Sequence, residues 1–355
     1  MLNDLASGKC LLQEGNRTLL LSEPMTASRK SIRWKGRTYQ IKDNLRIRGQ
    51  LFHVHNSIGH RCKQRMMAFQ QLGRNEFALR TIHVLEKRKD VRRQLRILLE
   101  SGCTNFPVPR VFFSHESRDY IYVVSEWVNG QSLQRYLSQV SLGRRPALSA
   151  YEAIRLTHRL VHQICTFAAN GFVHGDLHPG NLIINPNRGH RLTLIDFGSS
   201  FYFSESKSDR ETDGVHRIYA APEVLMGRES DLISEQFSIS LVFFRMLTGK
   251  VPYGSLGGQA GIGLEPANYP DAEKVKCDLF RKFPSRSKNL AEEFFQTTSQ
   301  LNRRQRFQTA KELRDAIDSV WESVKYRTAN TRRTDFLSKI FCKLNQFELF
   351  GRDSV

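Results

Sequence analysis

The feature that most constrains how this chain folds is a change in hydrophobic pattern near Trp127. Before this residue, short runs rich in β-branched and aromatic residues are separated by polar turns, which is typical of strands. After it, apolar residues recur at helical spacing in longer segments. Because the helices follow the strands instead of alternating with them, the sequence predicts an α+β protein with a small β-rich lobe and a larger α-helical lobe.

The first part of the chain predicts two pairs of strands around one helix. Residues 63–71 and 76–84 flank the turn LGRN, which indicates a β-hairpin. Residues 108–114 and 120–127 are joined by the polar turn HESRD and form a second pair. A basic stretch over 87–101 has apolar residues on one helical face. In all, we expect five strands and one helix in the small lobe.

Two capping boxes and one apolar helix are expected in the larger lobe. Ser149 with Glu152, and Thr309 with Glu312, have the spacing in which an N-cap hydroxyl and a glutamate satisfy each other's backbone N–H groups. Residues 234–247 are apolar almost all round, so this helix is expected at the centre of the lobe.

These patterns divide the chain into four parts. They are an N-terminal extension over 1–38, the small lobe over 39–127, the large lobe over 128–328 and a basic amphipathic tail over 329–355. Apolar residues in the tail recur at helical spacing beside lysines. Such a segment packs on its own domain, binds a partner or touches an acidic membrane surface, and packing on its own domain is the commonest outcome.

The charge of the chain points to anionic partners. Its 54 Lys and Arg residues outnumber 35 Asp and Glu residues, which gives a net charge of +19. The basic faces therefore suit contact with an acidic protein or a membrane surface. Nucleic-acid binding is the weakest interpretation, because no motif or aromatic platform accompanies the charge.

The sequence also predicts a cytoplasmic location. The six cysteines lie far apart, with no CxxC and no Cys/His cluster of zinc-ligand spacing, which argues against a disulfide scaffold or a structural zinc site. The longest apolar stretch carries Arg245 and is too short to be a transmembrane segment. The first residues do not have the pattern of a signal peptide.

Two short segments carry the chemistry. VHGDLHPGNLIIN contains Asp176 and Asn181, and LTLIDFGSS contains Asp196. A strand hairpin formed by the apolar runs between them would bring the two acidic loops to one edge. Phosphoryl transfer needs such a set, since a carboxylate accepts the proton of the attacking hydroxyl and oxygen ligands hold Mg²⁺.

These segments resemble motifs of the protein-kinase-like superfamily. HGDLHPGN followed by DFG resembles its catalytic and metal-binding loops, and YAAPEV over 219–224 resembles the end of its activation segment. SEQFSISLVFFRMLTGKVPY resembles the buried helix that follows. Arg306 stands where the family pairs an arginine with a glutamate, here Glu223. The motifs occur in family order from about residue 50 to 325, which implies a two-lobed kinase-like fold.

The resemblance implies roles for the loop residues. Asp176 is the catalytic base, and Asn181 and Asp196 are the magnesium ligands. His178 replaces the lysine that helps to orient the transferred phosphate. Glu235 stands where the family has the aspartate that holds the catalytic loop from below.

The resemblance also implies a nucleotide site, and the sequence departs from the family there. Glu126 and Val128 resemble the hinge whose backbone contacts adenine. Arg80 stands at the position of the lysine that grips the α- and β-phosphates, and its glutamate partner aligns with Gln94. Of the glycines of the family's phosphate-cradling loop, the resemblance leaves only Gly59 as a candidate. An arginine binds phosphate bidentately, but its planar fork is not equivalent to the point charge of lysine.

Three cations flank that glycine. Arg61, Lys63 and Arg65 either replace backbone amides as phosphate contacts or form a solvated basic turn, and both interpretations stay open.

Four functions follow from these features. The favoured one is a divergent, bacterial-type serine/threonine protein kinase that transfers the γ-phosphoryl group of Mg·ATP to a protein substrate. The alternatives are a pseudokinase scaffold, supported by Arg80 and Gln94, and a small-molecule phosphotransferase of the aminoglycoside type, suggested by HGDLHPGN. Nucleic-acid binding is the fourth and rests on charge alone.

Overall fold

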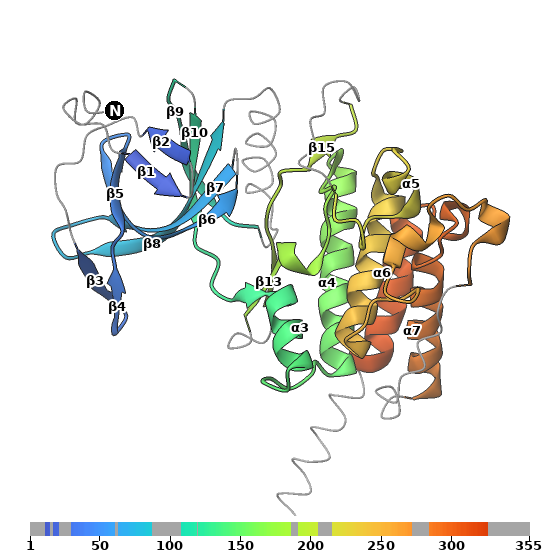
Figure 1. Cartoon of the computed structure of the whole chain (residues 1–355). Helices are drawn as coiled ribbons and strands as arrows, with labels where there is room; N and C mark the ends of the chain where they lie inside the picture. Colours follow the sequence, from blue (N-terminus) through green and yellow to red (C-terminus); the bar gives the residue numbers. More distant parts are fainter. Residues whose placement is uncertain are drawn as a thin grey trace, which may run out of the picture. The chain divides into compact units, whose positions relative to one another are not determined.

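A computed structural model gives the architecture of most of both predicted lobes. The structure describes residues 11–14, 17–20, 30–60, 63–86, 108–118, 120–185, 191–204, 215–271 and 284–325. The helix predicted over 87–101, which includes Gln94, and the tail over 329–355 lie outside these residues. The chain divides into two compact units, one built on residues up to Gln131 together with Asn181–Pro186 and Thr193–Gly214, and the other on the remaining residues (Figure 1).

The first unit is built on a six-stranded antiparallel sheet with the order β5-β6-β7-β8-β10-β9. Its strands are β5 (Asp43–Ile47), β6 (Gln50–His60), β7 (Lys63–Gln71), β8 (Phe77–Glu86), β9 (Val111–Glu116) and β10 (Tyr120–Glu126). The hairpin of β7 and β8 and the pair of β9 and β10 confirm the two strand pairs expected from the sequence. They were predictable because each pair is joined by a short polar turn.

The prediction of five strands for this unit is wrong, because this sheet alone has six, and neither β6 nor β5 was located from the sequence. The buried positions of β5 include Asp43 and Asn44, which are only 8% and 4% exposed. Asp43 Oδ1 accepts a hydrogen bond from the backbone N–H of Asn44 at 2.7 Å, and Asn44 Oδ1 contacts His53 Nδ1. Polar side chains that satisfy one another inside a core interrupt the apolar alternation by which strands are recognised.

The two faces of the sheet are both covered by apolar side chains. One cluster gathers Leu45, Ile47, Phe52, Val54, Met66, Ala68, Ile82, Val84, Tyr122 and Val124. The other gathers Phe69 and Leu79 with Ile32, which lies on the hairpin of β3 (Ser31–Trp34) and β4 (Arg37–Gln40). This hairpin crosses the boundary expected between residues 38 and 39. The end of the expected extension therefore packs on the small lobe.

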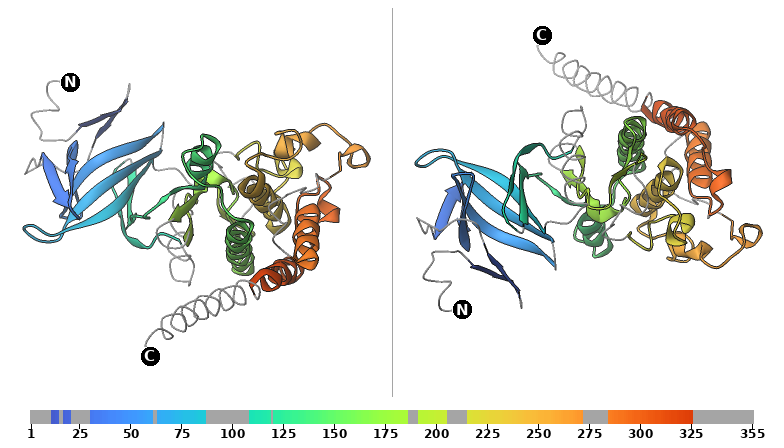
Figure 2. Two further views of the ribbon diagram at one scale, coloured as in Figure 1. Left: turned by 90° about the horizontal axis from the view of Figure 1, so that it is seen from below. Right: turned by 90° about the horizontal axis from the view of Figure 1, so that it is seen from above.

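The second unit is mainly helical. Its helices are α3 (Leu133–Ser141), α4 (Ala150–Ala169), α5 (Pro222–Leu225), α6 (Leu232–Thr248), α7 (Ser285–Thr298) and a helix over residues 310–325. Figures 1 and 2 show α4, α6 and α7 side by side. Helix α6 is buried along most of its length, as predicted, and ends at Gly249 in the left-handed conformation. No helix of the described ranges combines the length and hydropathy needed to cross a membrane.

Both predicted capping boxes are present. Ser149 Oγ accepts from the N–H of Glu152 at 3.2 Å, and a carboxylate oxygen of Glu152 accepts from the N–H of Ser149 at 3.0 Å. Thr309 and Glu312 make the same pair of bonds at 3.1 and 3.3 Å. Each helix start is therefore determined by residues only three positions apart.

Short elements connect the larger ones. They are the hairpin of β1 (Leu11–Glu14) and β2 (Arg17–Leu20), the strands β11 (Gln131–Ser132), β12 (Phe172–Val173), β13 (Leu182–Asn185), β14 (Arg191–Leu194) and β15 (Phe201–Tyr202), and the 3₁₀ turns Pro179–Asn181, Gly257–Gly261, Pro266–Asn268 and Arg303–Gln305. Strands β13 and β14 are neighbours in one small sheet, which confirms the strand pair expected between the two acidic loops.

Candidate active site

Asp176 lies in the loop that follows β12, where two histidines contact its carboxylate. Oδ1 accepts a hydrogen bond from the backbone N–H of His216 at 2.9 Å, and Oδ2 lies 3.4 Å from His178 Nε2. Burial would raise the pKa of Asp176, but the contact with His178 and the N–H of His216 outweigh it and hold this pKa below its usual value. Asp176 is therefore an ionised acceptor at neutral pH.

The tautomer of His178 follows from its neighbours. Its Nδ1 accepts a hydrogen bond from the N–H of Gly180 at 3.1 Å, so Nε2 is the ring nitrogen that carries a proton toward Asp176. A Cβ atom added to Gly180 would lie 2.5 Å from His178 Cε1. Glycine at this position is therefore needed to keep the imidazole against the carboxylate.

The second histidine packs against the first. The ring centroids of His178 and His216 are 4.6 Å apart. Burial and the nearby His178 lower the pKa of His216. Its Nδ1 is buried and has no hydrogen-bond partner among the described atoms. His216 is therefore neutral, and it acts on Asp176 through its backbone.

Helix α6 holds the loop that contains Asp176 through a hydrogen bond from Glu235, the position that the resemblance implied. Glu235 Oε1 accepts from the N–H of Gly175 at 2.9 Å, and the side chain is 3% exposed. Burial raises the pKa of Glu235 to about 8, although the N–H groups of Gly175 and His174 oppose this. His174 is fully buried, and its Nδ1 lies 3.4 Å from the N–H of Asp176. These contacts support a structural role for His174.

The two predicted magnesium ligands, Asn181 and Asp196, belong to the first, β-rich unit and lie near each other. The N–H of Ile195 donates to the backbone oxygen of Asn181 at 2.9 Å, and Asp196 is the next residue. Asp196 is exposed and has a φ of +65°, a conformation that costs energy for a non-glycine residue. Its Oδ1 accepts from the N–H of Gly198 at 3.3 Å. An amide and a carboxylate are the oxygen donors that Mg²⁺ prefers, so this pair fits the ion.

The hairpin of β6 and β7, which carries the predicted basic residues, contributes a cation that interacts with Asp196. Gly59 and Lys63 lie on strands β6 and β7 next to their turn, whereas Arg61 lies outside the described residues. Arg65 of β7 is partly buried. Burial lowers the pKa of Arg65, and the negative charge of Asp196 opposes that shift. Arg65 is therefore a described cation that interacts with the DFG aspartate.

Arg80, in contrast, is engaged by its own sheet. Its Nε donates to Gln70 Oε1 at 2.8 Å, and its guanidinium carbon lies 4.0 Å from the ring centroid of Phe112. Burial lowers the pKa of Arg80, Glu126 raises it, and Arg110 lowers it further. A phosphate would have to compete with Gln70 for this side chain.

The predicted hinge follows β10. Glu126 lies opposite Arg80 in the register of β8 and β10, and its N–H donates to the backbone oxygen of Arg110 at 2.7 Å. Val128 follows in the connection to β11 and is partly buried. Nothing in these contacts tests the adenine role of Glu126 or Val128, which stays a prediction.

The predicted ion pair of Glu223 and Arg306 is confirmed. Arg306 Nη1 and Nη2 lie 2.6 and 3.0 Å from the two carboxylate oxygens of Glu223, and both residues are buried. The guanidinium also donates to the backbone oxygens of Gln300, Ile233 and Leu301. A buried charge pair is tolerated when its remaining hydrogen-bonding groups are satisfied in this way.

The YAAPEV segment is held by a close backbone approach from the loop after α6. The N–H of Gly258 donates to the oxygen of Ile218 at 3.0 Å. A Cβ atom on Gly258 would lie 1.8 Å from the oxygen of Ala220, and one on Gly257 would lie 2.1 Å from the oxygen of Ile218. Neither position has room for a side chain.

One group of side chains was missed in the sequence. His158 and His162 of α4 both contact Asp318, which lies 160 and 156 residues further on. The four-residue spacing of the histidines is visible in the sequence, but zinc sites recognised by the spacing of cysteines do not include it. Their carboxylate partner is apparent only in the folded chain.

The fold and the loop motifs together define the class of this protein. A β-rich unit followed by a helical unit, with HGDLHPGN before β13 and DFG after β14, is the arrangement of a protein kinase domain. A family model described as protein kinase domain matches residues 60–321, which is more than half of the chain. The chain therefore belongs to the protein kinase domain family.

Several curated proteins are similar to this chain. Serine/threonine-protein kinase AtPK1/AtPK6 of Arabidopsis thaliana is 30% identical over 146 residues, which cover 41% of this chain and 30% of the plant protein. Probable serine/threonine-protein kinase PknB of Lactococcus lactis is 27% identical over 172 residues, with 48% and 26% covered. Human ribosomal protein S6 kinase alpha-4 is 27% identical over 209 residues, with 58% and 25% covered. The chain thus spans less than a third of the length of these relatives.

Proposed function

We propose that this protein is an ATP-dependent serine/threonine protein kinase. The observation that carries the proposal is the position of Asp176, whose Oδ1 accepts from the N–H of His216 at 2.9 Å and whose Oδ2 lies 3.4 Å from His178 Nε2. The chain belongs to the protein kinase domain family, and the motif HGDLHPGN supports the assignment of Asp176 as the catalytic base. The relatives come from a plant, a bacterium and a human, so the bacterial type expected from the sequence stays a prediction.

In this proposal, Asp176 orients the substrate hydroxyl and accepts its proton as the oxygen attacks the γ-phosphorus of ATP. His178 takes the place of the family lysine. Its Nε2–H is directed at Asp176 in the free enzyme, and a donor at this position stabilises charge on the transferred group. Asn181 and Asp196 would hold Mg²⁺, which would supply charge neutralisation on the phosphates.

Phosphate contacts are divided between two arginines. Arg80 stands at the family lysine position but is already bonded to Gln70, whereas Arg65 interacts with the charge of Asp196. We assign a phosphate contact to Arg80 and a supporting one to Arg65. Glu126 and Val128 would present backbone groups to adenine.

A pseudokinase is the second candidate function, and the contacts of Arg80 favour it. A guanidinium that is held by Gln70 and packed on Phe112 is poorly placed to exchange partners for each nucleotide. Such a protein would bind ATP weakly or not at all and act through its surface. Its function would then be to bind acidic partners in the cytoplasm through its basic faces, and not catalysis.

The test is incubation of the full chain with labelled Mg·ATP and a generic protein substrate. Label transfer should be lost in Asp176→Asn and in Asp196→Asn. It should persist in Asp315→Asn, a control carboxylate paired with Lys311 on an exposed helix face. No transfer by the natural chain, together with a rise in melting temperature on adding Mg·ATP, would favour the pseudokinase. Transfer only to small alcohols such as amino-sugars would favour a small-molecule phosphotransferase.

A further inference from the structure

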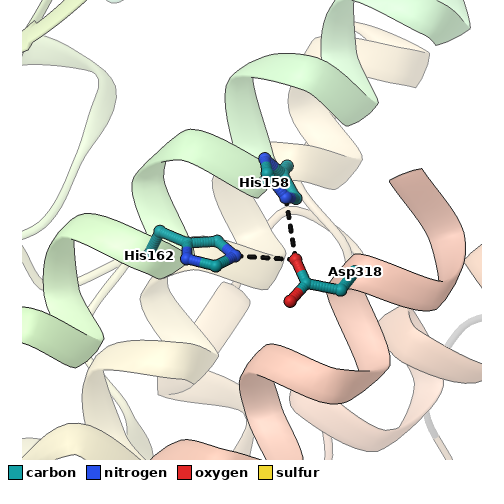
Figure 3. A group of neighbouring side chains, drawn as sticks. All are labelled: His158, His162 and Asp318. Carbon is teal, nitrogen blue, oxygen red and sulfur yellow. Dashed lines mark hydrogen bonds and ion pairs between the residues drawn. The ribbon is translucent and has the colours of Figure 1, made fainter. Parts of the chain in front are cut away.

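Three side chains of the helical unit converge on one point, and none of them belongs to the predicted kinase site. His158 and His162 lie one turn apart on α4, and Asp318 lies on the helix over 310–325 (Figure 3). His158 Nε2 and His162 Nε2 are 2.8 and 2.7 Å from the same oxygen, Oδ1 of Asp318. Among the described residues, this is the one group of three His, Cys, Asp or Glu side chains whose ligand atoms lie within 4.8 Å of one another.

We propose that His158, His162 and Asp318 form a binding site for a divalent transition-metal ion of the zinc type. Histidines four residues apart on a helix present their nitrogens on one face, which is a recurrent way to hold zinc. Zinc binds imidazole nitrogen at about 2.0–2.1 Å and carboxylate oxygen at about 2.0–2.2 Å, so tetrahedral ligands lie roughly 3.4 Å apart. A small withdrawal of the carboxylate would make the group fit.

The exposure of the side chains permits that withdrawal. The side chains of His158, His162 and Asp318 are 21%, 40% and 43% exposed. Asp318 can therefore rotate toward solvent, and an ion can reach the site without opening the helices. A water molecule would complete the coordination at the solvent side, as in zinc sites with three protein ligands.

The imidazoles are held in place by neighbouring rings. The ring of His158 lies 5.4 Å from that of Trp321 and 4.5 Å from that of His162. Trp321 in turn lies 5.4 Å from the ring of Tyr151. Packing of this kind fixes ring orientation before an ion arrives, which reduces the entropy lost on binding.

The ligand set selects the class of ion. Two imidazoles and one carboxylate suit zinc, cobalt and nickel, whereas magnesium and calcium prefer oxygen ligands only. The site therefore differs in chemistry from Asn181 and Asp196. When occupied, it would join α4 to the helix over 310–325, and α4 leads directly into β12 and the catalytic loop.

The experiment is a titration of the full chain with CoCl₂ in excess Mg²⁺, read by the visible absorption of four-coordinate cobalt and followed by displacement with ZnCl₂. The decisive variant carries His158→Gln and His162→Gln. Its amide groups can still donate hydrogen bonds to Asp318, but it lacks both imidazole nitrogens. Because loss of an outer-shell partner alone costs about 10–100-fold in metal affinity, loss of both ligands should weaken cobalt binding by more than about 100-fold.

Matched controls separate the site from other metal-binding groups. His55→Gln removes a histidine of β6 that lies outside the cluster, and it should leave cobalt affinity unchanged. Asp318→Asn should weaken binding, whereas Asp315→Asn on the same helix should not. Melting in EDTA reports the fold of each variant, and Asp318→Asn decides if the double variant does not fold. Equal cobalt affinity in the natural chain and in a folded ligand variant, or no cobalt binding by the natural chain, would overturn the proposal.

Discussion

Replacement of Glu235 by glutamine should change how stability depends on pH. Glu235 is 3% exposed and accepts a hydrogen bond from the N–H of Gly175 at 2.9 Å, and burial raises its pKa to about 8. Glutamine has nearly the same shape, keeps an oxygen acceptor and has no charge. It therefore removes the titration while retaining the contact with the catalytic loop.

The size and sign of the effect follow from linkage. The pKa of Glu235 is about 8 in the folded chain, against an ordinary value of 4.5. A raised pKa means that the folded state binds a proton that the unfolded state has lost between these two pH values. The contribution of Glu235 is therefore fully present below about pH 4.5 and falls by about 1.4 kcal/mol per pH unit until about pH 8. The whole change is on the order of 5 kcal/mol.

Urea unfolding of the natural chain and of Glu235→Gln, measured from about pH 5 to about pH 8, tests this reasoning. The unfolding free energy of the natural chain should fall relative to that of the variant by about 4 kcal/mol over the range. Glu293→Gln, which changes an exposed glutamate of α7, should run parallel to the natural chain. A constant difference between the natural chain and Glu235→Gln would refute the assignment of a protonated Glu235 at neutral pH.

Three other substitutions give defined expectations. Arg306→Met leaves a buried carboxylate without its partner and should lower the unfolding free energy by about 3–5 kcal/mol, measured by urea unfolding; a loss below about 1 kcal/mol would contradict the buried pair. Gly180→Ala should displace His178 and lower kcat without changing the melting temperature, and it should add nothing in a chain that already carries His178→Ala. Arg80→Ala should weaken Mg·ATP binding by about 10- to 150-fold, since a charged hydrogen bond is worth about 1.5–3 kcal/mol, and Arg80→Lys should keep most of the affinity. Unchanged Kd in Arg80→Ala but weaker binding in Arg65→Ala would transfer the phosphate role to Arg65.

Features encoded within a few residues of one another were predictable from the sequence. The capping box of Ser149 and Glu152, the turn between β7 and β8 and the end of α6 at Gly249 each depend on neighbouring positions. The loop motifs likewise indicated Asp176 as a candidate base from residue type and order alone, and that role stays a prediction. Its contacts with two histidines required the fold, since His216 is 40 residues away.

Features that join distant segments were not predictable in the same way. Strand β5 was missed because Asp43 and Asn44 are polar residues inside the core. Their hydrogen bonds, from the N–H of Asn44 to Asp43 and between Asn44 and His53, become apparent only when β5 and β6 are paired. The packing of Ile32 on the six-stranded sheet depends on Phe69, which lies on another hairpin. The hydrophobic pattern of a segment indicates which of its positions face the core. It does not indicate which polar groups form hydrogen bonds with a neighbouring strand.

The tight contact of Gly257 and Gly258 with the carbonyls of Ile218 and Ala220 has a consequence for how the protein tolerates variation. Both glycines lie in the loop after α6, where substitutions are usually accepted. In a library of all single substitutions selected for activity, these two positions should nevertheless be as depleted as Asp176. Positions that tolerate no substitution in such a library would therefore include residues with a structural role as well as catalytic ones.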